Sequence, residues 1–296
     1  MKKILLFTFL ILLLSVIPLI AIDWPSSAGV IIRNFGHNNA GLPHLGISFA
    51  STETIEAAGA GELLFHQRRG DTASRLPSTL GSWLAVDHGD GIISIYSRFR
   101  DETPSEENMT AFRAGQINSG MYLGESGISG WSSRNGFYFQ LYDRTERRWL
   151  NPALIIPPPL DTRMPDILST RLVDSDANVF FNPSAVRSLS QGRYTVIVDT
   201  FDTMRSANEN PLAPFRIICL LNGREAGALD FISFSARDGS LIVQRNGLIP
   251  VRQVYSQFPA YEIADIWLNR GQANLEIIVQ DIMGNRRNII YRFLVE

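Results

Sequence analysis

The segment Gly136-Phe137-Tyr138-Phe139-Gln140-Leu141 has the aromatic and apolar composition of a β-strand. In a strand, Phe137 and Phe139 share one face and Tyr138 points to the other. Further short β-rich runs, separated by Gly, Asn and Asp, precede it from residue 29 onward. They are GVIIRNF (29–35), ELLF (62–65), WLAVDHG (83–89) and GIISIYSRFR (91–100). No long stretch has a helical period, so the sequence predicts an all-β protein.

A proline cluster, Pro157 to Pro159, divides this region from a second set of strand-like runs, because no strand interior tolerates three missing donors. About seven such runs follow over residues 165–296, a number typical of a β-sandwich of immunoglobulin-like (Ig-like) type. A Gly284-Asn285 turn near the C-terminus separates an apolar strand from an alternating one and predicts a closing hairpin. We therefore expect a first domain over residues 22–157, a Pro-rich linker over 158–164 and a second domain over 165–296.

The composition of the chain excludes some classes of function. The chain has 296 residues, of which 45% are hydrophobic and 19% charged, with a net charge of −2. Two of its 27 basic residues, Lys2 and Lys3, are lysines, and the others are arginines. The numbers of basic and acidic residues are nearly equal, without the excess of positive charge that is typical of nucleic-acid-binding proteins, so we expect no nucleic-acid partner. The single cysteine, Cys219, lies in an apolar stretch and predicts a buried thiol with no disulfide partner in the chain.

The N-terminus has the pattern of a secretion signal. Lys2 and Lys3 precede an apolar run from Ile4 to Ile22, and Ala21 offers a small residue for cleavage. We expect residues 1–21 to be a signal peptide and the protein to be exported to the periplasm or cell envelope. The run is also long enough to span a bilayer, so an uncleaved leader would be the one membrane contact.

The order of six segments in the first domain can be compared with that of known families. They are Phe35-Gly36 with His44 to Ala50, Thr54 to Glu62, Trp83 to Gly91 with Ser94 to Tyr96, Ala114 to Gly130, Gly136 to Leu141, and Leu150-Asn151-Pro152. In this order they resemble the lysostaphin-type (LytM) zinc endopeptidases, which cut peptidoglycan cross-links. The resemblance covers roughly residues 29–156 and implies a LytM-like β-sheet and barrel-sandwich hybrid domain.

Such an enzyme needs a zinc ion held by two imidazoles and a carboxylate, with an open position for a water molecule. By resemblance, His44 matches the first ligand, but Ser48 replaces the carboxylate and Tyr138 the second imidazole. Arg98 and Gly136 stand where the two assisting histidines would be. A hydroxyl is a poor zinc ligand, a phenol has an ordinary pKa of about 10, and arginine cannot act as a base. We therefore expect a degenerate domain without metal, cofactor or catalytic residues.

The former cleft could still bind a ligand. Tyr138, Arg98 and Trp131, with His44 and Ser48, could hold a glycan or peptide by stacking and hydrogen bonds. The alternative for the aromatic residues is plain packing, and for His44 a hydrogen-bonded position in a β cleft. A serine nucleophile, Ser48 beside His44, is a further alternative, because residues four apart in a strand share a face. It lacks a recognised oxyanion motif.

Another histidine, His88, lies in the segment Val86 to Gly91. It has two interpretations, a residue of a turn or a metal ligand.

The sequence thus predicts a non-catalytic cell-envelope protein that binds peptidoglycan or regulates a murein hydrolase. One alternative is an active zinc metalloendopeptidase acting on peptidoglycan cross-links, with zinc as cofactor. Another is a structural envelope protein whose two domains contact other proteins.

Overall fold

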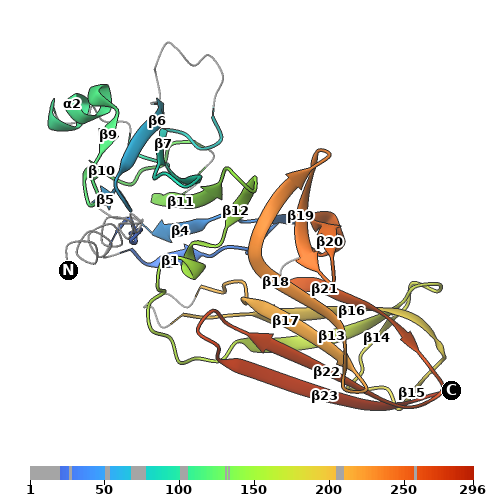
Figure 1. The fold of residues 1–296 in the computed structure, drawn as a ribbon. Coiled ribbons are helices and arrows are strands. Elements are labelled where there is room, and N and C mark those ends of the chain that lie inside the picture. The colour runs from blue at the N-terminus through green and yellow to red at the C-terminus, as the bar shows by residue number, and fades with distance from the viewer. Residues whose placement is uncertain are drawn as a thin grey trace, which may run out of the picture.

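The computed structural model describes residues 21–26, 29–50, 54–67, 78–100, 106–130, 132, 134–204, 210–256 and 259–296 (Figure 1). Nearly all elements in these ranges are β-strands, which confirms the all-β prediction. The exceptions are the helix α2 (Glu106–Ala114) and two short 3-10 turns, η1 (Pro152–Leu154) and η2 (Val251–Gln253). The predicted signal peptide lies almost entirely outside the described residues. Within them, no helix combines the length and the apolar character needed to cross a membrane.

The N-terminal half contains an antiparallel sheet in the order β1-β4-β11-β8-β7-β6-β9. Its strands are β1 (Ile31–Arg33), β4 (Ile47–Ala50), β6 (Gly61–Gln67), β7 (Trp83–Asp87), β8 (Ile92–Ser97), β9 (Gln116–Ile117) and β11 (Gly136–Asp143). Two small pairs stand beside it, β2 (Asn38–Asn39) with β3 (Leu42–Pro43) and β5 (Ile55–Glu56) with β10 (Tyr122–Gly124). Phe137 and Phe139 are fully buried in the core of this half, and Phe137 stacks on Phe49 at 4.5 Å between ring centroids.

The C-terminal half consists of two sheets around a second core. One has the order β14-β13-β16-β21 and the other β15-β23-β22-β17-β18, with β19 and β20 continuing from β18. The first contains β13 (Asp166–Asp174), β14 (Phe180–Phe181), β16 (Gly192–Phe201) and β21 (Ala260–Leu268). The second contains β15 (Ser188–Leu189), β17 (Arg216–Leu221), β18 (Arg224–Arg237), β19 (Ser240–Arg245), β20 (Leu248–Pro250), β22 (Gly271–Gln280) and β23 (Arg286–Val295).

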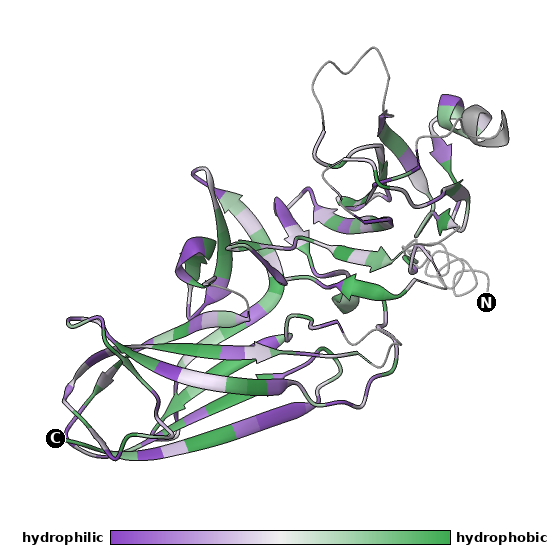
Figure 2. Ribbon diagram, turned by 180° about the vertical axis from the view of Figure 1, so that it is seen from behind, coloured by the Kyte–Doolittle hydropathy of each residue, from purple (hydrophilic) through white to green (hydrophobic). Residues whose placement is uncertain are grey.

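Hydrophobic and hydrophilic residues are interspersed along these strands, as expected when one face of each sheet covers a core (Figure 2). Cys219 is a free, fully buried thiol in this core, as predicted. The strands β22 and β23 form the predicted closing hairpin, in which Gly284 has a φ of 91°. The assignment of this half to the Ig-like type stays a prediction.

One strand joins the two halves into a continuous sheet. β12 (Arg148–Leu150) pairs with β11 on one side and with β18 on the other (Figure 1). β18 has 14 residues while its hairpin partner β17 has six, so residues 233–235 of β18 are free to pair with β12. The sequence indicated only a Pro-rich connection between the halves, whereas the structure adds direct strand pairing.

A loop of the N-terminal half also enters the C-terminal core. Phe35 is 2% exposed and lies 5.0 Å from Phe234 between ring centroids. At Gly36, which has a φ of +82°, a Cβ atom would lie 2.7 Å from the ring of Phe231, so only glycine fits. The hydroxyl of Tyr255 donates a hydrogen bond of 2.6 Å to the Gly36 carbonyl. The junction is therefore packed like a protein interior.

Truncating Phe35 tests this packing. We expect Phe35→Ala to lower the free energy of unfolding by about 3–5 kcal/mol, because it leaves a cavity in the shared core. Urea unfolding followed by tryptophan fluorescence measures the change. Leu42→Ala is a matched control, since Leu42 lies in the same N-terminal region but is 62% exposed. Equal stability of the Phe35→Ala variant and the wild type would contradict the packed junction.

Candidate functional site

The site lies where β4, β11 and β8 run side by side. Tyr138 on β11 is directly opposite Ser48 on β4 and opposite Ser97 on β8. Arg98 follows β8 immediately and has a φ of 70°, a left-handed conformation that few non-glycine residues adopt. The register of three neighbouring strands therefore brings together residues that are far apart in the sequence.

Four of the five residues predicted for the cleft converge. The Nε2 atom of His44 lies 2.9 Å from the Ser48 hydroxyl oxygen, to which Arg98 Nη1 also donates at 3.4 Å. The rings of His44 and Tyr138 stack at 4.5 Å between centroids. The Arg98 guanidinium carbon lies 5.3 Å from the centre of the Tyr138 ring. The fifth residue, Trp131, lies outside the described residues, and a binding role for the group stays a prediction.

His44 and Ser48 meet for a reason other than the one the sequence indicated. Strand alternation was the expected cause, but β4 begins only at Ile47, after His44. The backbone of His44 instead exchanges hydrogen bonds with a neighbouring loop, accepting from the Gly36 N–H at 2.8 Å and donating to the His37 carbonyl at 2.9 Å. Loop closure thus places the imidazole over Ser48.

The electrostatics of the cluster keep His44 and Tyr138 neutral. Burial, followed by the positive charge of Arg98, holds the pKa of His44 well below its ordinary value. Burial also raises the pKa of Tyr138 above that of a free phenol, although Arg98 acts in the opposite direction. At physiological pH the site therefore contains a neutral imidazole, a neutral phenol and a permanent cation.

This donor set does not fit a zinc ion. Zinc sites in proteins use several imidazole, thiolate or carboxylate ligands. Of the four cleft residues, His44 alone offers such a group, and its Nε2 atom is bonded to Ser48. Within the described ranges, no group of three His, Cys, Asp or Glu side chains capable of holding a metal lies beside His44. Gly136 has no room for a side chain, because a Cβ atom there would lie 2.4 Å from the Phe49 carbonyl oxygen.

The serine-nucleophile alternative also lacks its supporting groups. Ser48 is fully buried, and no carboxylate of the described residues is hydrogen-bonded to His44 to orient it. Such an orienting group fixes the tautomer of the base in serine hydrolases. The His44–Ser48 pair is therefore better explained as a buried hydrogen bond.

His88 is a bridging residue of the N-terminal core. It is buried, its Nδ1 atom lies 2.8 Å from the Ala60 carbonyl and its Nε2 atom 2.7 Å from the Ser94 hydroxyl. Both ring nitrogens are thus occupied, which leaves none for a metal. Of the two interpretations, a structural residue next to the turn agrees with these contacts.

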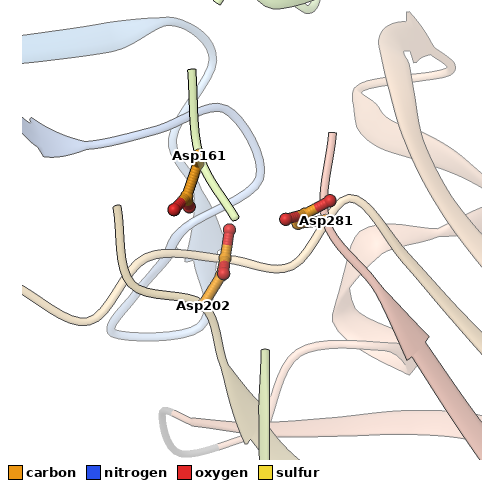
Figure 3. A group of neighbouring side chains, drawn as sticks. All are labelled: Asp161, Asp202 and Asp281. Atoms are coloured by element: carbon orange, nitrogen blue, oxygen red, sulfur yellow. The ribbon is translucent and has the colours of Figure 1, made fainter. Parts of the chain in front are cut away.

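A second cluster, formed by Asp161, Asp202 and Asp281, was not predicted. Their carboxylates converge from the connection between the halves, the end of β16 and the end of β22 (Figure 3). One oxygen of each lies within 4.8 Å of the others, and all three residues are buried. Both oxygens of Asp281 accept hydrogen bonds from Asn285, at 2.8 Å and 2.7 Å. Three segments far apart in the chain build this group, so no local motif reveals it.

The environment of Asp202 favours its protonated form. Burial, and next the charge of Asp281, raises the pKa of Asp202 from 3.8 to about 7. Asp161 and Asp166 act in the same direction, while a hydrogen bond from the Thr203 N–H opposes them. The folded protein thus retains a proton that the unfolded chain would release.

Because Asp202 retains its proton in the folded protein, the free energy of unfolding should depend on pH. Because the folded pKa exceeds the unfolded one, the contribution of Asp202 is complete below pH 4 and is lost as the pH rises through about 7. We expect Asp202→Asn to raise the urea midpoint at pH 8 and to raise it less at pH 5, because the loss begins above about pH 4 and is complete only above about pH 7. Asp176→Asn, which makes the same substitution at an exposed aspartate in the turn after β13, is the control. An Asp202→Asn effect of the same size at both pH values would contradict the retained proton.

Comparisons with known proteins cover both halves. A protein-family model that carries no functional description matches residues 164–296. An uncharacterized protein from Treponema pallidum (strain Nichols) is 26% identical over 129 residues, which span 41% of this chain and 86% of that protein.

Among solved structures, the chain is similar to M23 peptidase and lysostaphin proteins. The catalytic domain of the prophage-encoded M23 protein EnpA from Enterococcus faecalis is 20% identical, with 42% of this chain and 87% of that chain covered and a TM-score of 0.31. A chain of the SpoIIQ–SpoIIIAH pore-forming complex is 17% identical, with coverage of 48% and 94% and a TM-score of 0.35. Lysostaphin from Staphylococcus simulans is 13% identical, with coverage of 84% and 99% and a TM-score of 0.32. At these identities and TM-scores, the similarities assign no function to the chain.

Proposed function

We propose that this protein is an exported, non-catalytic component of the cell envelope. In this proposal it uses the cleft beside Ser48 to bind peptidoglycan or to regulate a murein hydrolase. The observation that carries the proposal is the closed group of His44, Ser48, Arg98 and Tyr138. These residues occupy the positions that resemble the zinc and water sites of a LytM enzyme.

The contacts within this group oppose hydrolysis. A metal-dependent hydrolase needs a Lewis acid and a base beside the water it activates. The imidazole of His44 is bonded to Ser48, the Tyr138 hydroxyl is a neutral phenol, and the guanidinium of Arg98 cannot accept a proton. None of these groups can take the proton of an attacking water and also hold a metal.

Binding makes smaller demands on the same residues. A ligand needs a cavity and a few fixed polar groups, and a polar cavity of about 330 Å³ opens beside Ser48 and Arg98. The hydrogen bond to Ser48 and the contact with Tyr138 fix the guanidinium of Arg98 before any ligand arrives, which lowers the entropy lost on binding.

Co-sedimentation with purified peptidoglycan sacculi tests the proposal. We expect the purified protein to sediment with sacculi equally in EDTA and in added zinc, because no group at the site requires a metal. We also expect no loss of turbidity of the suspension in zinc. Metal content after dialysis against zinc, measured by mass spectrometry, should stay far below one ion per chain. An active M23 peptidase serves as the positive control for clearing.

The other outcomes separate the alternatives. Zinc-dependent clearing with stoichiometric zinc would establish the metalloendopeptidase and overturn the proposal. Absence of binding, together with no effect on the rate at which a murein hydrolase clears the sacculi, would favour the structural envelope protein.

A further inference from the structure

The cavity beside Ser48 has an unusual lining. Its volume is about 330 Å³, and its walls come from β1, the loop after β8, the segment before β11 and residues 210–211 of the C-terminal half. Three lining residues, Arg33, Arg98 and Arg134, are arginines, and none of the lining residues that the structure describes is an aspartate or glutamate. The cavity is therefore a concentration of positive charge in a chain whose net charge is negative.

These arginines lack counter-ions in the described part of the chain. Five other arginines, Arg144, Arg148, Arg171, Arg216 and Arg287, each pair with an aspartate at 2.7–3.3 Å. Neither Arg33, Arg98 nor Arg134 forms such a pair with any described carboxylate. Arg98 is half-buried, and among the described residues its side chain contacts two neutral groups, the Ser48 hydroxyl and the Tyr138 ring. A half-buried charge with neutral partners alone is incompletely compensated.

The neighbouring imidazoles also respond to the uncompensated charge. The charges of Arg98 and Arg33 add to burial in lowering the pKa of His44. Burial and Arg33 lower the pKa of His37 to about 4. Arg33 also disfavours the charge on Arg98, after the larger effect of burial. The charges of Arg33 and Arg98 therefore act on each other and on the two imidazoles, and an anion bound in the cavity would reduce each of these unfavourable interactions.

We infer that this cavity is an oxyanion-binding site, in which Arg33, Arg98 and Arg134 bind a carboxylate of the ligand. A guanidinium group presents parallel N–H donors that match a carboxylate or a phosphate in a bidentate way. The inference rests on the proposed function, because the wall peptides of peptidoglycan supply carboxylates. Phosphate groups of a cell wall share the same chemistry and are the second source to be tested.

The test uses an Arg33→Gln/Arg134→Gln double variant. Both side chains are exposed, so their replacement leaves the buried His44–Ser48–Arg98 group in place. Arg224→Gln is the matched control, since Arg224 is an exposed arginine at the start of β18 that does not line the cavity. Thermal unfolding verifies that all variants are folded. Each protein is titrated with native sacculi and with sacculi whose carboxyl groups have been converted to amides.

We expect the double variant to bind native sacculi about tenfold more weakly than the wild type, which corresponds to about 1.4 kcal/mol. Amidation of the sacculi should weaken wild-type binding by a similar factor or more, and binding should decrease with added salt. The control should behave as the wild type. Equal binding of the double variant and the wild type to native sacculi would overturn the inference and leave the proposed function intact.

Inorganic phosphate separates the remaining outcomes. If amidation has no effect but phosphate displaces wild-type protein from the sacculi, the oxyanion is a wall phosphate and the carboxylate assignment is wrong. If the wild type does not bind sacculi at all, the proposed peptidoglycan binding fails. Calorimetric titration with phosphate then tests the cavity directly. Saturable phosphate binding by the wild type and not by the double variant supports the oxyanion site. Absence of phosphate binding by the wild type overturns the oxyanion site.

Discussion

The pairing of β12 with both β11 and β18 is the constraint on which the arrangement of the molecule depends. It makes the strand that carries Tyr138 part of a sheet extending into the C-terminal half. The loop that holds Phe35 fixes the same junction from the other side, and Asn34 beside it exchanges hydrogen bonds of 2.7 Å and 2.8 Å with Ala213. Residues of both halves line the cavity beside Ser48, so both halves determine its shape.

The chemistry of the cleft beside Ser48 follows from the side chains that face one another in it. A metal centre needs anionic or imidazole donors around an open position, whereas here the facing side chains satisfy one another. The hydroxyl of Ser48 lies between an imidazole and a guanidinium, and the phenol of Tyr138 stacks on the imidazole. The positive charge that remains faces the cavity and suits an anion better than a cation.

Much of the fold follows from local patterns in the sequence. The strand composition, the alternation of Phe137, Tyr138 and Phe139, the turn at Gly284 and the buried Cys219 all required only neighbouring residues. The alternation of residues along a strand shows which face of the strand each side chain occupies, but it does not show which strand lies beside it. The pairing of β12 with β11 and β18 therefore could not be predicted from the sequence.

For the same reason the three buried aspartates were not predicted, because each lies in a separate segment and carries no local signal. The four cleft residues were placed together through motif order, yet the contact between His44 and Ser48 depends on a loop whose closure no periodic pattern encodes. The close approach of the β4 backbone to Gly136 restricts which residues this position can hold. A side chain introduced at that position would push the Phe49 carbonyl away and force two paired strands apart, so the cleft cannot gain an imidazole there unless its own sheet is rebuilt.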